Sequence, residues 1–261
     1  MIQNLRELYL YRELLLMIVW RDIKVRYKQS LMGFMWAILM PMLIVCAGIL
    51  VRYAIAVIST KPLLFSDIAS VSVKALPWSF FVGSVRFGTE SLRKDTNLVT
   101  KIYFPKEIFP ISAVLSSFVD FIVASCLLVV ILMIFQIGFS VYLLWVPILI
   151  LLLILMVTGL SLILSALNLY FRDVKYLVEV VMTFAIFFTP VLYDVAMFDK
   201  WRNILLLNPM APILEGISAC VVMHGPPHAG WLTYSAVVSC LILGFDYPIF
   251  KKLECRFAES I

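Results

Sequence analysis

Residues 21–41 read RDIKVRYKQSLMGFMWAILMP, and this stretch decides the fold of the chain. Four cations lie within its first eight residues, Arg12 precedes them, and the uncharged run that follows continues from Leu31 to Val51. When an apolar segment crosses a membrane, cations gathered at one of its ends hold that end in the cytoplasm. The stretch therefore predicts a membrane protein whose first span leaves from the cytoplasmic side.

The composition of the whole chain agrees with a membrane protein. Hydrophobic residues make up 63% of the 261 residues and charged residues only 14%. A soluble domain has about 45–50% apolar and about 25% charged residues, so this chain could not cover its surface with polar groups. We expect an all-α integral membrane protein without a cleaved signal peptide. The 5 cysteines are odd in number and fit neither a disulfide framework nor a metal site.

Six apolar segments are candidates for crossing a bilayer core of about 30 Å, which takes about 20 helical residues. They form one predicted transmembrane domain over residues 31–261, with spans at about 31–55, 68–91, 111–134, 145–169, 176–191 and 231–250. Six spans place both termini on the cytoplasmic side, and the positive-inside rule agrees. Of the 21 Lys and Arg residues, the predicted outer segments hold only Arg52, Lys61, Lys74, Lys200 and Arg202.

Two regions depart from the pattern of a plain apolar span. Lys74 and Arg86 lie inside the second span, and we expect Lys74 to extend its ammonium group outward and Arg86 its guanidinium group inward. Between spans five and six, Trp201–Leu207 and Pro212–Met223 are apolar but too short to cross. They predict two short re-entrant helices on the outer side.

Residues 1–30 are predicted to form an amphipathic helix that lies along the cytoplasmic face of the membrane. Such a helix binds with its basic side against anionic lipid. Its apolar side carries Leu5, Tyr9, Leu16, Trp20, Ile23 and Tyr27 at helical spacing. A solvated helix packed on a partner protein is the alternative. The net charge of +5 is explained by topology, so no nucleic-acid partner is expected.

The sequence contains no motif that is typical of a catalytic or metal site. A nucleotide-binding loop, a Gly-x-Ser-x-Gly turn and a His-Glu-x-x-His helix are all absent from it. His224 and His228 are four residues apart, but Gly225-Pro226-Pro227 between them forbids the helix that would align two metal ligands. We therefore expect neither catalytic residues nor a bound metal.

Asp120 is the one acid deep within a predicted span. An ionised carboxylate there costs about 2.5–3.5 kcal/mol on membrane-insertion scales, so it must be paired or neutral. Thr158 and Ser161 on the fourth span, or Arg86 on the second, could be its partner. A proton relay and a hydrogen bond between helices are the two roles that this carboxyl group could have.

Two further features allow a functional as well as a structural interpretation. Phe184, Phe187 and Phe188 fall at helical spacing on the fifth span. They either pack against lipid and core or form a wall of rings for the apolar faces of sugars. The basic segment Arg93–Glu107, which contains Phe104-Pro105, is either a charged anchor or a docking element for a cytoplasmic motor.

Short motifs in order along the chain resemble those of type-2 ABC transporter permeases that export polysaccharides. The opening motifs are Arg21-Asp22, Arg26-Tyr27-Lys28-Gln29-Ser30, Gly33, Trp36 and Pro41. The later ones are Pro77-Trp78, Lys101 with Phe104-Pro105, Phe171-Arg172-Asp173, Thr189-Pro190-Val191 with Tyr193, Asn208-Pro209-Met210 with Pro212, and Phe250-Lys251-Lys252-Leu253. Each motif is short, but the ordered set covers nearly the whole chain.

The resemblance implies a homodimeric permease subunit in the bacterial inner membrane. It would export a lipid-linked polysaccharide such as O-antigen, capsule or a teichoic-acid-like polymer. Two copies of a separate cytoplasmic ATPase would bind and hydrolyse the ATP, so this chain needs no cofactor. Contacts with the ATPase are expected within residues 21–30 and 97–106, at Arg21, Arg26, Tyr27, Lys28, Lys101, Tyr103 and Phe104. An aromatic channel is expected at Phe34, Trp36, Phe184, Phe187 and Phe188.

Two other transport functions stay open at this point. One is a related ABC permease that exports a drug or a lipid. The other is an ion-coupled secondary transporter, which would show an internal repeat between its two halves, and we find none in the sequence. Lys74 departs from the family, which usually has a small or apolar residue at this position, and it leaves the outer boundary of span two undecided.

Overall fold

The computed structural model describes residues 7–28, 35–59, 62, 64–96, 98, 104–134, 138, 140–198, 200–254 and 257. Within these ranges the chain is helical and has no strand, which confirms the predicted all-α class. The α-helices are α2 (Arg12–Tyr27), α3 (Trp36–Ser59), α4 (Phe65–Lys94), α6 (Ile108–Ile134), α7 (Val146–Tyr170), α8 (Val174–Phe188), α9 (Arg202–Leu206), α10 (Met210–Val221) and α11 (Ala229–Glu254). Two 3₁₀-helices are η2 (Val141–Trp145) and η3 (Val195–Met197).

Five helical segments are long and apolar enough to cross a membrane, namely α3, α4, α6, η2 with α7, and α11. They coincide with predicted spans one, two, three, four and six, and they make the protein a multi-pass membrane protein. α8 coincides with the fifth predicted span but has only 15 residues, a length of about 22 Å at 1.5 Å per residue. The fifth span, and with it the count of six spans, therefore remains a prediction.

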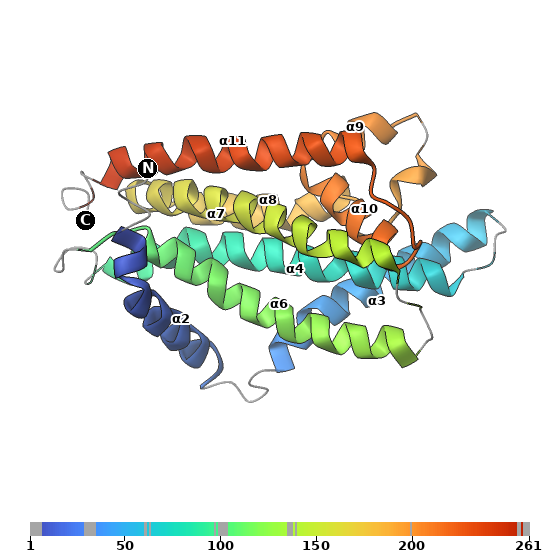
Figure 1. Ribbon diagram of the computed structural model, residues 1–261, viewed down its shortest axis with the longest axis horizontal. Helices are drawn as coiled ribbons and strands as arrows, with labels where there is room; N and C mark the ends of the chain where they lie inside the picture. The colour runs from blue at the N-terminus through green and yellow to red at the C-terminus, as the bar shows by residue number, and fades with distance from the viewer. Residues whose placement is uncertain are drawn as a thin grey trace.

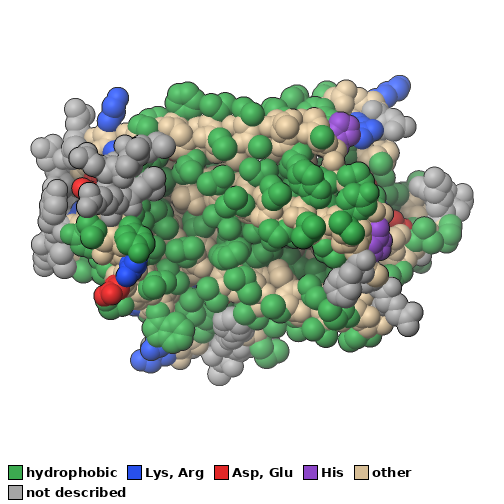
Figure 2. Space-filling model, in the orientation of Figure 1, with side chains coloured by type: hydrophobic (Ala, Val, Ile, Leu, Met, Phe, Trp, Pro, Cys, Tyr) green, Lys and Arg blue, Asp and Glu red, His purple; other side chains and the backbone are tan. Residues whose placement is uncertain are grey.

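The long helices lie side by side along the longest axis of the molecule (Figure 1). At one end lie α2, the beginning of α6 and the end of α11, and we name this the α2 end. The short helices α9 and α10 lie at the opposite end, which we name the α10 end. Figure 2 shows hydrophobic side chains over the face between the two ends, with coloured charged side chains mostly toward the ends. This distribution is the one expected of a protein surrounded by lipid.

Helix α4 is the centre of the bundle, because it packs against α3, α6, α7, α8 and α10. Its aromatic side chains Trp78, Phe80 and Phe81 are buried, and Phe80 lies 5.4 Å from Phe121 of α6 between ring centroids. Trp78 stacks on Phe81 at 5.6 Å. Pro77 lies inside the same helix, where it removes one backbone hydrogen bond. Neighbouring helices compensate such a break inside a membrane bundle.

The expectation that Lys74 extends outward as far as the solvent is wrong. Its side chain is fully buried, and its ammonium nitrogen lies 2.5 Å from a carboxylate oxygen of Asp194 and 3.1 Å from one of Glu215. A charged group can remain inside a protein when ion pairs and hydrogen bonds replace its water. Helix α4 begins well before it, at Phe65, so Lys74 lies inside the helix.

Gly159 lets α7 and α11 approach each other closely. A Cβ atom at this position would lie 2.7 Å from Cγ2 of Ile242 and 3.0 Å from both the Cα and the N of Leu243. Backbone atoms cannot rotate away, so Gly159→Ala is expected to separate the helices and cost about 1–3 kcal/mol. Gly244→Ala is the matched control, because no described atom lies within 4 Å of its added Cβ. Equal midpoints of thermal unfolding in the two variants would contradict this prediction.

Candidate functional site

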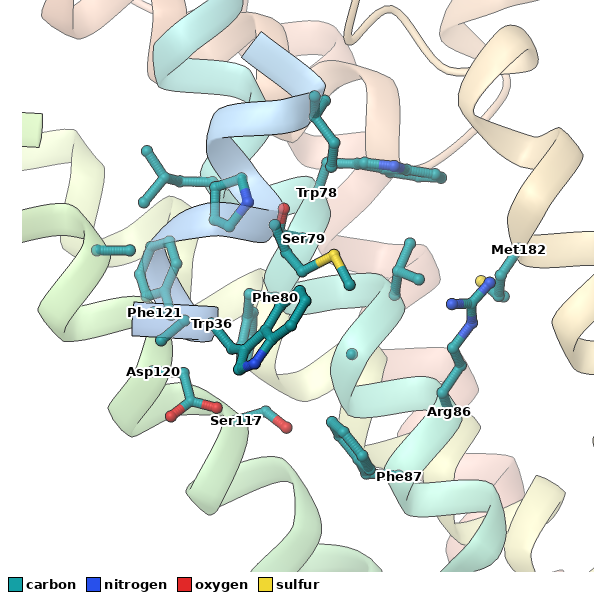
Figure 3. A pocket seen from close by; sticks show the side chains of 18 of the residues that line it. Trp36, Trp78, Ser79, Phe80, Arg86, Phe87, Ser117, Asp120, Phe121 and Met182 are labelled. Atoms are coloured by element: carbon teal, nitrogen blue, oxygen red, sulfur yellow. The ribbon is translucent and has the colours of Figure 1, made fainter. Parts of the chain in front are cut away.

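A cavity of about 800 Å³ opens between α3, α4, α6 and α8, and the end of α2 forms part of its wall. Side chains from several helices line it (Figure 3). Its aromatic lining is Trp36, Trp78, Phe80, Phe87 and Phe121. Its polar lining is Arg26, Tyr27, Ser79, Arg86, Glu90, Ser117, Asp120, Glu179 and Thr183. A mostly apolar cavity with a few convergent polar groups is the usual form of a ligand site.

Helical periodicity explains how α4 and α8 supply most of the polar groups. On α4 the lining residues Ser79, Arg86 and Glu90 recur at intervals that keep them on one face. Glu179 and Thr183 lie four residues apart on α8, so they face the cavity together. Of these residues, only Arg86 was predicted to take part in a polar contact; Ser79, Glu90, Glu179 and Thr183 were not predicted as site residues. The spacing of charged and hydroxyl residues on otherwise apolar spans was the signal that could have found them.

Two polar contacts join α4 to α8 at this cavity. Nη2 of Arg86 donates a hydrogen bond to Oγ1 of Thr183 at 3.2 Å. The ammonium group of Lys175 pairs with Oε1 of Glu90 at 2.6 Å. Arg86 therefore turns sideways to α8 instead of reaching toward the end of its own helix. Since both contacts are exposed on the single chain, they can break at small cost when the helices move.

Asp120 has a partner that was not among those predicted from the sequence. Its carboxylate pairs with the guanidinium group of Arg26, which comes from α2, 94 residues earlier. Thr158 and Ser161 instead donate to backbone carbonyl groups, at 2.7 Å and 3.3 Å. Neither they nor Arg86 bind the carboxylate. The expected partners of Asp120 were therefore wrong, and its charge partner is Arg26.

Arg26 is held by more than its ion pair. Nη2 lies 3.4 Å from the hydroxyl oxygen of Ser116, and the guanidinium carbon lies 4.0 Å from the ring centroid of Phe87. A cation over an aromatic face is attracted by the ring, most strongly where water is excluded. Burial and the negative charge of Asp120 raise the pKa of the neighbouring Tyr27 to about 12, so its hydroxyl group stays protonated at neutral pH.

A second attachment holds α2 to the end of α4. Both guanidinium nitrogens of Arg21 bind the carboxylate of Asp95, at 2.9 Å and 2.5 Å. Burial alone would lower the pKa of Arg21, but its hydrogen bonds to Asp95 and Asp22 outweigh burial and raise the pKa. Lys94 adds a 3.4 Å contact to Asp22. Helix α2 is therefore clamped at two points, to α4 through Arg21 and to α6 through Arg26.

The other residues predicted to contact an ATPase lie in different surroundings. Lys28 is exposed next to the end of α2. Phe104 is buried and lies 5.5 Å from Phe109 between ring centroids. Lys101 and Tyr103 lie outside the described residues.

The residues predicted to line a channel divide into two groups. Trp36 lines the cavity, where Figure 3 shows its indole ring between Asp120 on one side and Arg86 on the other. Phe184, Phe187 and Phe188 do not line it, and they are 58%, 63% and 72% exposed. They lie on the part of α8 that this single chain leaves uncovered. Phe34 lies outside the described residues.

Comparisons with known proteins find similarity along the whole length of the chain. Residues 13–222 match the family model described as ABC-2 type transporter. The chain is 32% identical over 264 residues to a protein of Myxococcus xanthus named "O-antigen export system permease protein RfbA", and the match covers 100% of both chains. A protein of Klebsiella pneumoniae with the same name is 26% identical over 255 residues, covering 97% of this chain and 96% of its own. A second Klebsiella pneumoniae protein of that name is 27% identical over 255 residues, which again cover 97% of this chain and 96% of its own.

Proposed function

This chain belongs to the ABC-2 type transporter family, and on that premise we propose that it carries a lipid-linked polysaccharide across the bacterial inner membrane. The substrate class would be O-antigen, capsule or a similar polymer. One observation carries the proposal, namely that the similarity to the O-antigen export permeases extends over the whole chain. It therefore includes each helix that lines the cavity. The family consists of permeases, which are not themselves catalytic, so the chain is not an enzyme.

In the proposed topology the α2 end faces the cytoplasm and the α10 end faces outward. Six spans, with α8 as the fifth, would leave both termini in the cytoplasm, as the distribution of cations supports. The short helices α9 and α10 would dip back into the membrane from the outer face. Helix α2 would lie at the inner surface, where the exposed side chains of Leu16, Met17 and Trp20 suit contact with lipid.

Two copies of the chain and two copies of a cytoplasmic ATPase would form the exporter. ATP would bind to the ATPase alone, so the permease would need no cofactor. The exposed rings Phe184, Phe187 and Phe188 support the homodimer, because a second copy could place its own rings opposite them. The two cavities and the rings between them would form an aromatic path, on which the apolar faces of sugars can stack.

The two clamps on α2 suggest how the ATPase would act on this path. When the ATPase subunits close, they would push on the exposed face of α2 and on the segment that precedes α6. The movement would pass through the Arg21–Asp95 pair to α4 and through the Arg26–Asp120 pair to α6. Because both helices line the cavity, its shape would change with each ATPase cycle.

Deletion of the gene, with complementation by variants, tests the proposed function. We expect the deletion to remove the polymer from the cell surface and the native chain to restore it. Trp36→Ala should lower surface polymer by about tenfold, because an aromatic platform for sugars is lost. Trp145→Ala is the matched control, since this tryptophan lies in η2 and does not line the cavity.

The same strains separate the alternative functions. Staining of intact cells with a lectin or an antibody measures the polymer. Normal staining in the deletion strain, together with a change in drug resistance or in membrane lipid, would favour a drug or lipid exporter and contradict the proposal. Export that continues without a partner ATPase would favour an ion-coupled transporter.

A further inference from the structure

A group of charged residues around two buried cations lies at the α10 end, and none of its members lines the cavity already described. It comprises Arg52 of α3, Asp67 and Lys74 of α4, Asp194 after α8, and Glu215 of α10, and we name it the Lys74 cluster. Arg52 and Lys74 are 2% and 0% exposed. Charged groups buried to this degree in a membrane protein are expensive, so they are expected to have a specific role.

Asp194 joins the two cations of the cluster. Its Oδ1 atom lies 2.5 Å from Nζ of Lys74, and its Oδ2 atom lies 2.5 Å from Nη2 of Arg52. Burial alone would raise the pKa of Asp194, but Lys74 and then Arg52 outweigh it and hold the pKa at about 2. The carboxyl group is therefore ionised at neutral pH, as its pairs with both cations require.

Lys74 uses its remaining hydrogens on the segment that carries the short helices. It donates to the backbone oxygen of Tyr193 at 3.0 Å and to Oε1 of Glu215 at 3.1 Å. The same oxygen of Glu215 accepts a hydrogen bond from the backbone nitrogen of Val195 at 3.3 Å. One ammonium group thus fixes both the turn after α8 and helix α10.

Neighbouring hydroxyl groups extend the cluster across the same boundary. Ser70 of α4 donates to Oδ1 of Asp194 at 3.0 Å, and its oxygen lies 2.9 Å from that of Ser218 on α10. Arg52 also lies 3.4 Å from Asp67, which in turn accepts a hydrogen bond from the backbone nitrogen of Leu64 at 3.0 Å. The cluster therefore ties α3, the beginning of α4, the turn after α8 and α10 into one unit.

Buried ion pairs contribute little to stability compared with well-packed apolar groups, but they can select one arrangement over others. An apolar residue at position 74 could pack against many neighbours, whereas an ammonium group is satisfied only where these carboxylates meet it. We propose that Lys74 is a positioning residue, which holds α10 and the turn after α8 against α3 and α4. Its effect on export rests on the proposed function, but the positioning itself does not.

Cys220 provides a reporter for this positioning. It lies on α10 two residues after Ser218, and it is a fully buried free thiol. With Cys46, Cys126, Cys240 and Cys255 replaced by alanine, the rate at which a maleimide labels Cys220 in isolated membranes reports the release of α10. A buried thiol is labelled only when the structure around it opens.

We expect Lys74→Met to raise the labelling rate of Cys220 by about tenfold, because the helix opens more often once its anchor is lost. Lys74→Arg keeps the charge and should restore a rate near that of the parent. Glu215→Gln should give a smaller increase, and in combination with Lys74→Met it should add little, because the two residues act through one contact. Lys175→Met removes an exposed ion pair between α8 and α4 and serves as the control, with no increase expected.

Two results would overturn the inference: a parental labelling rate in Lys74→Met, or an equal increase in Lys175→Met. If Lys74→Met fails to accumulate in the membrane, the labelling rate of Cys220 in Glu215→Gln is the test. A rate equal to that of the parent in this variant overturns the inference. Surface polymer is measured in the same strains, and Lys74→Met should lower it several-fold while Lys74→Arg restores it. The parent is the permease that keeps only Cys220. If this parent exports no polymer, the proposed function is contradicted, but the labelling result still stands.

Discussion

Arg26→Glu is expected to lower polymer export by at least about tenfold, because it places a second carboxylate against Asp120. Two like charges about 4 Å apart repel by about 4 kcal/mol at an effective dielectric constant of 20. The variant would also lose the contacts of Arg26 with Ser116 and with the ring of Phe87. One of the two clamps between α2 and the cavity wall would then open. Surface polymer on cells that carry equal amounts of membrane-inserted permease measures the effect.

The double variant Arg26→Glu with Asp120→Arg restores the opposite charges in exchanged positions. We expect it to recover a large part of the export that Arg26→Glu loses, because two residues in direct contact compensate each other in a double variant. Arg12→Glu is the control, since Arg12 is an exposed cation on the same helix. If Arg12→Glu lowers export as much as Arg26→Glu, the loss reflects the charge of α2 and not the clamp.

Asp120→Asn distinguishes the two roles that the sequence left open for this carboxyl group. Because its charge partner is Arg26, we expect export to fall by a similar factor at every pH. A proton relay would instead change the dependence of export on pH. Full export at every pH would exclude both the relay and the clamp.

Lys251→Met is expected to have the largest effect on stability, because it leaves Glu107 unpaired in the interior. Glu107 is 0% exposed, and its carboxylate accepts from Nζ of Lys251 at 2.6 Å and from the hydroxyl group of Tyr247 at 3.1 Å. Removing one partner of a buried pair costs about 3–5 kcal/mol, since the other charge remains without compensation. The midpoint of thermal unfolding in detergent should fall accordingly.

The next residue along the chain supplies the matched control for Lys251→Met. Lys252 is exposed, so Lys252→Met should leave the unfolding midpoint within experimental error of the parent. Glu107→Gln combined with Lys251→Met removes both charges and should be less destabilising than Lys251→Met alone. If the double variant is no more stable than Lys251→Met, the unpaired carboxylate is not the cause of the loss.

The long helices could be predicted from the sequence because their signals are local. Runs of apolar residues placed α4, α6, α7 and α11 within a few residues of their observed bounds. The first span was predicted to end at residue 55, whereas α3 continues to Ser59. Proline and polar residues mark helix ends only approximately, so the boundaries moved while the order of helices did not.

Part of the candidate site was also predictable, and the rest was not. The aromatic motif pointed to Trp36, which lines the cavity, but spacing alone could not tell which face of α8 turns inward. Glu179 and Thr183 turn to the cavity, while Phe184 and Phe188 remain exposed on the single chain. That division depends on how α8 packs against α4, which no local pattern contains.

The sequence by itself determined that the chain is a helical membrane protein, which segments are apolar, and to which family it belongs, because hydropathy, helical spacing and motifs are properties of neighbouring residues. Only the tertiary structure decided how the buried charges are paired. Arg26 meets Asp120 across 94 residues, and Lys74 meets Glu215 across 141. The free energy of a buried charge depends on the groups within a few ångströms of it, and the packing of distant helices sets those groups.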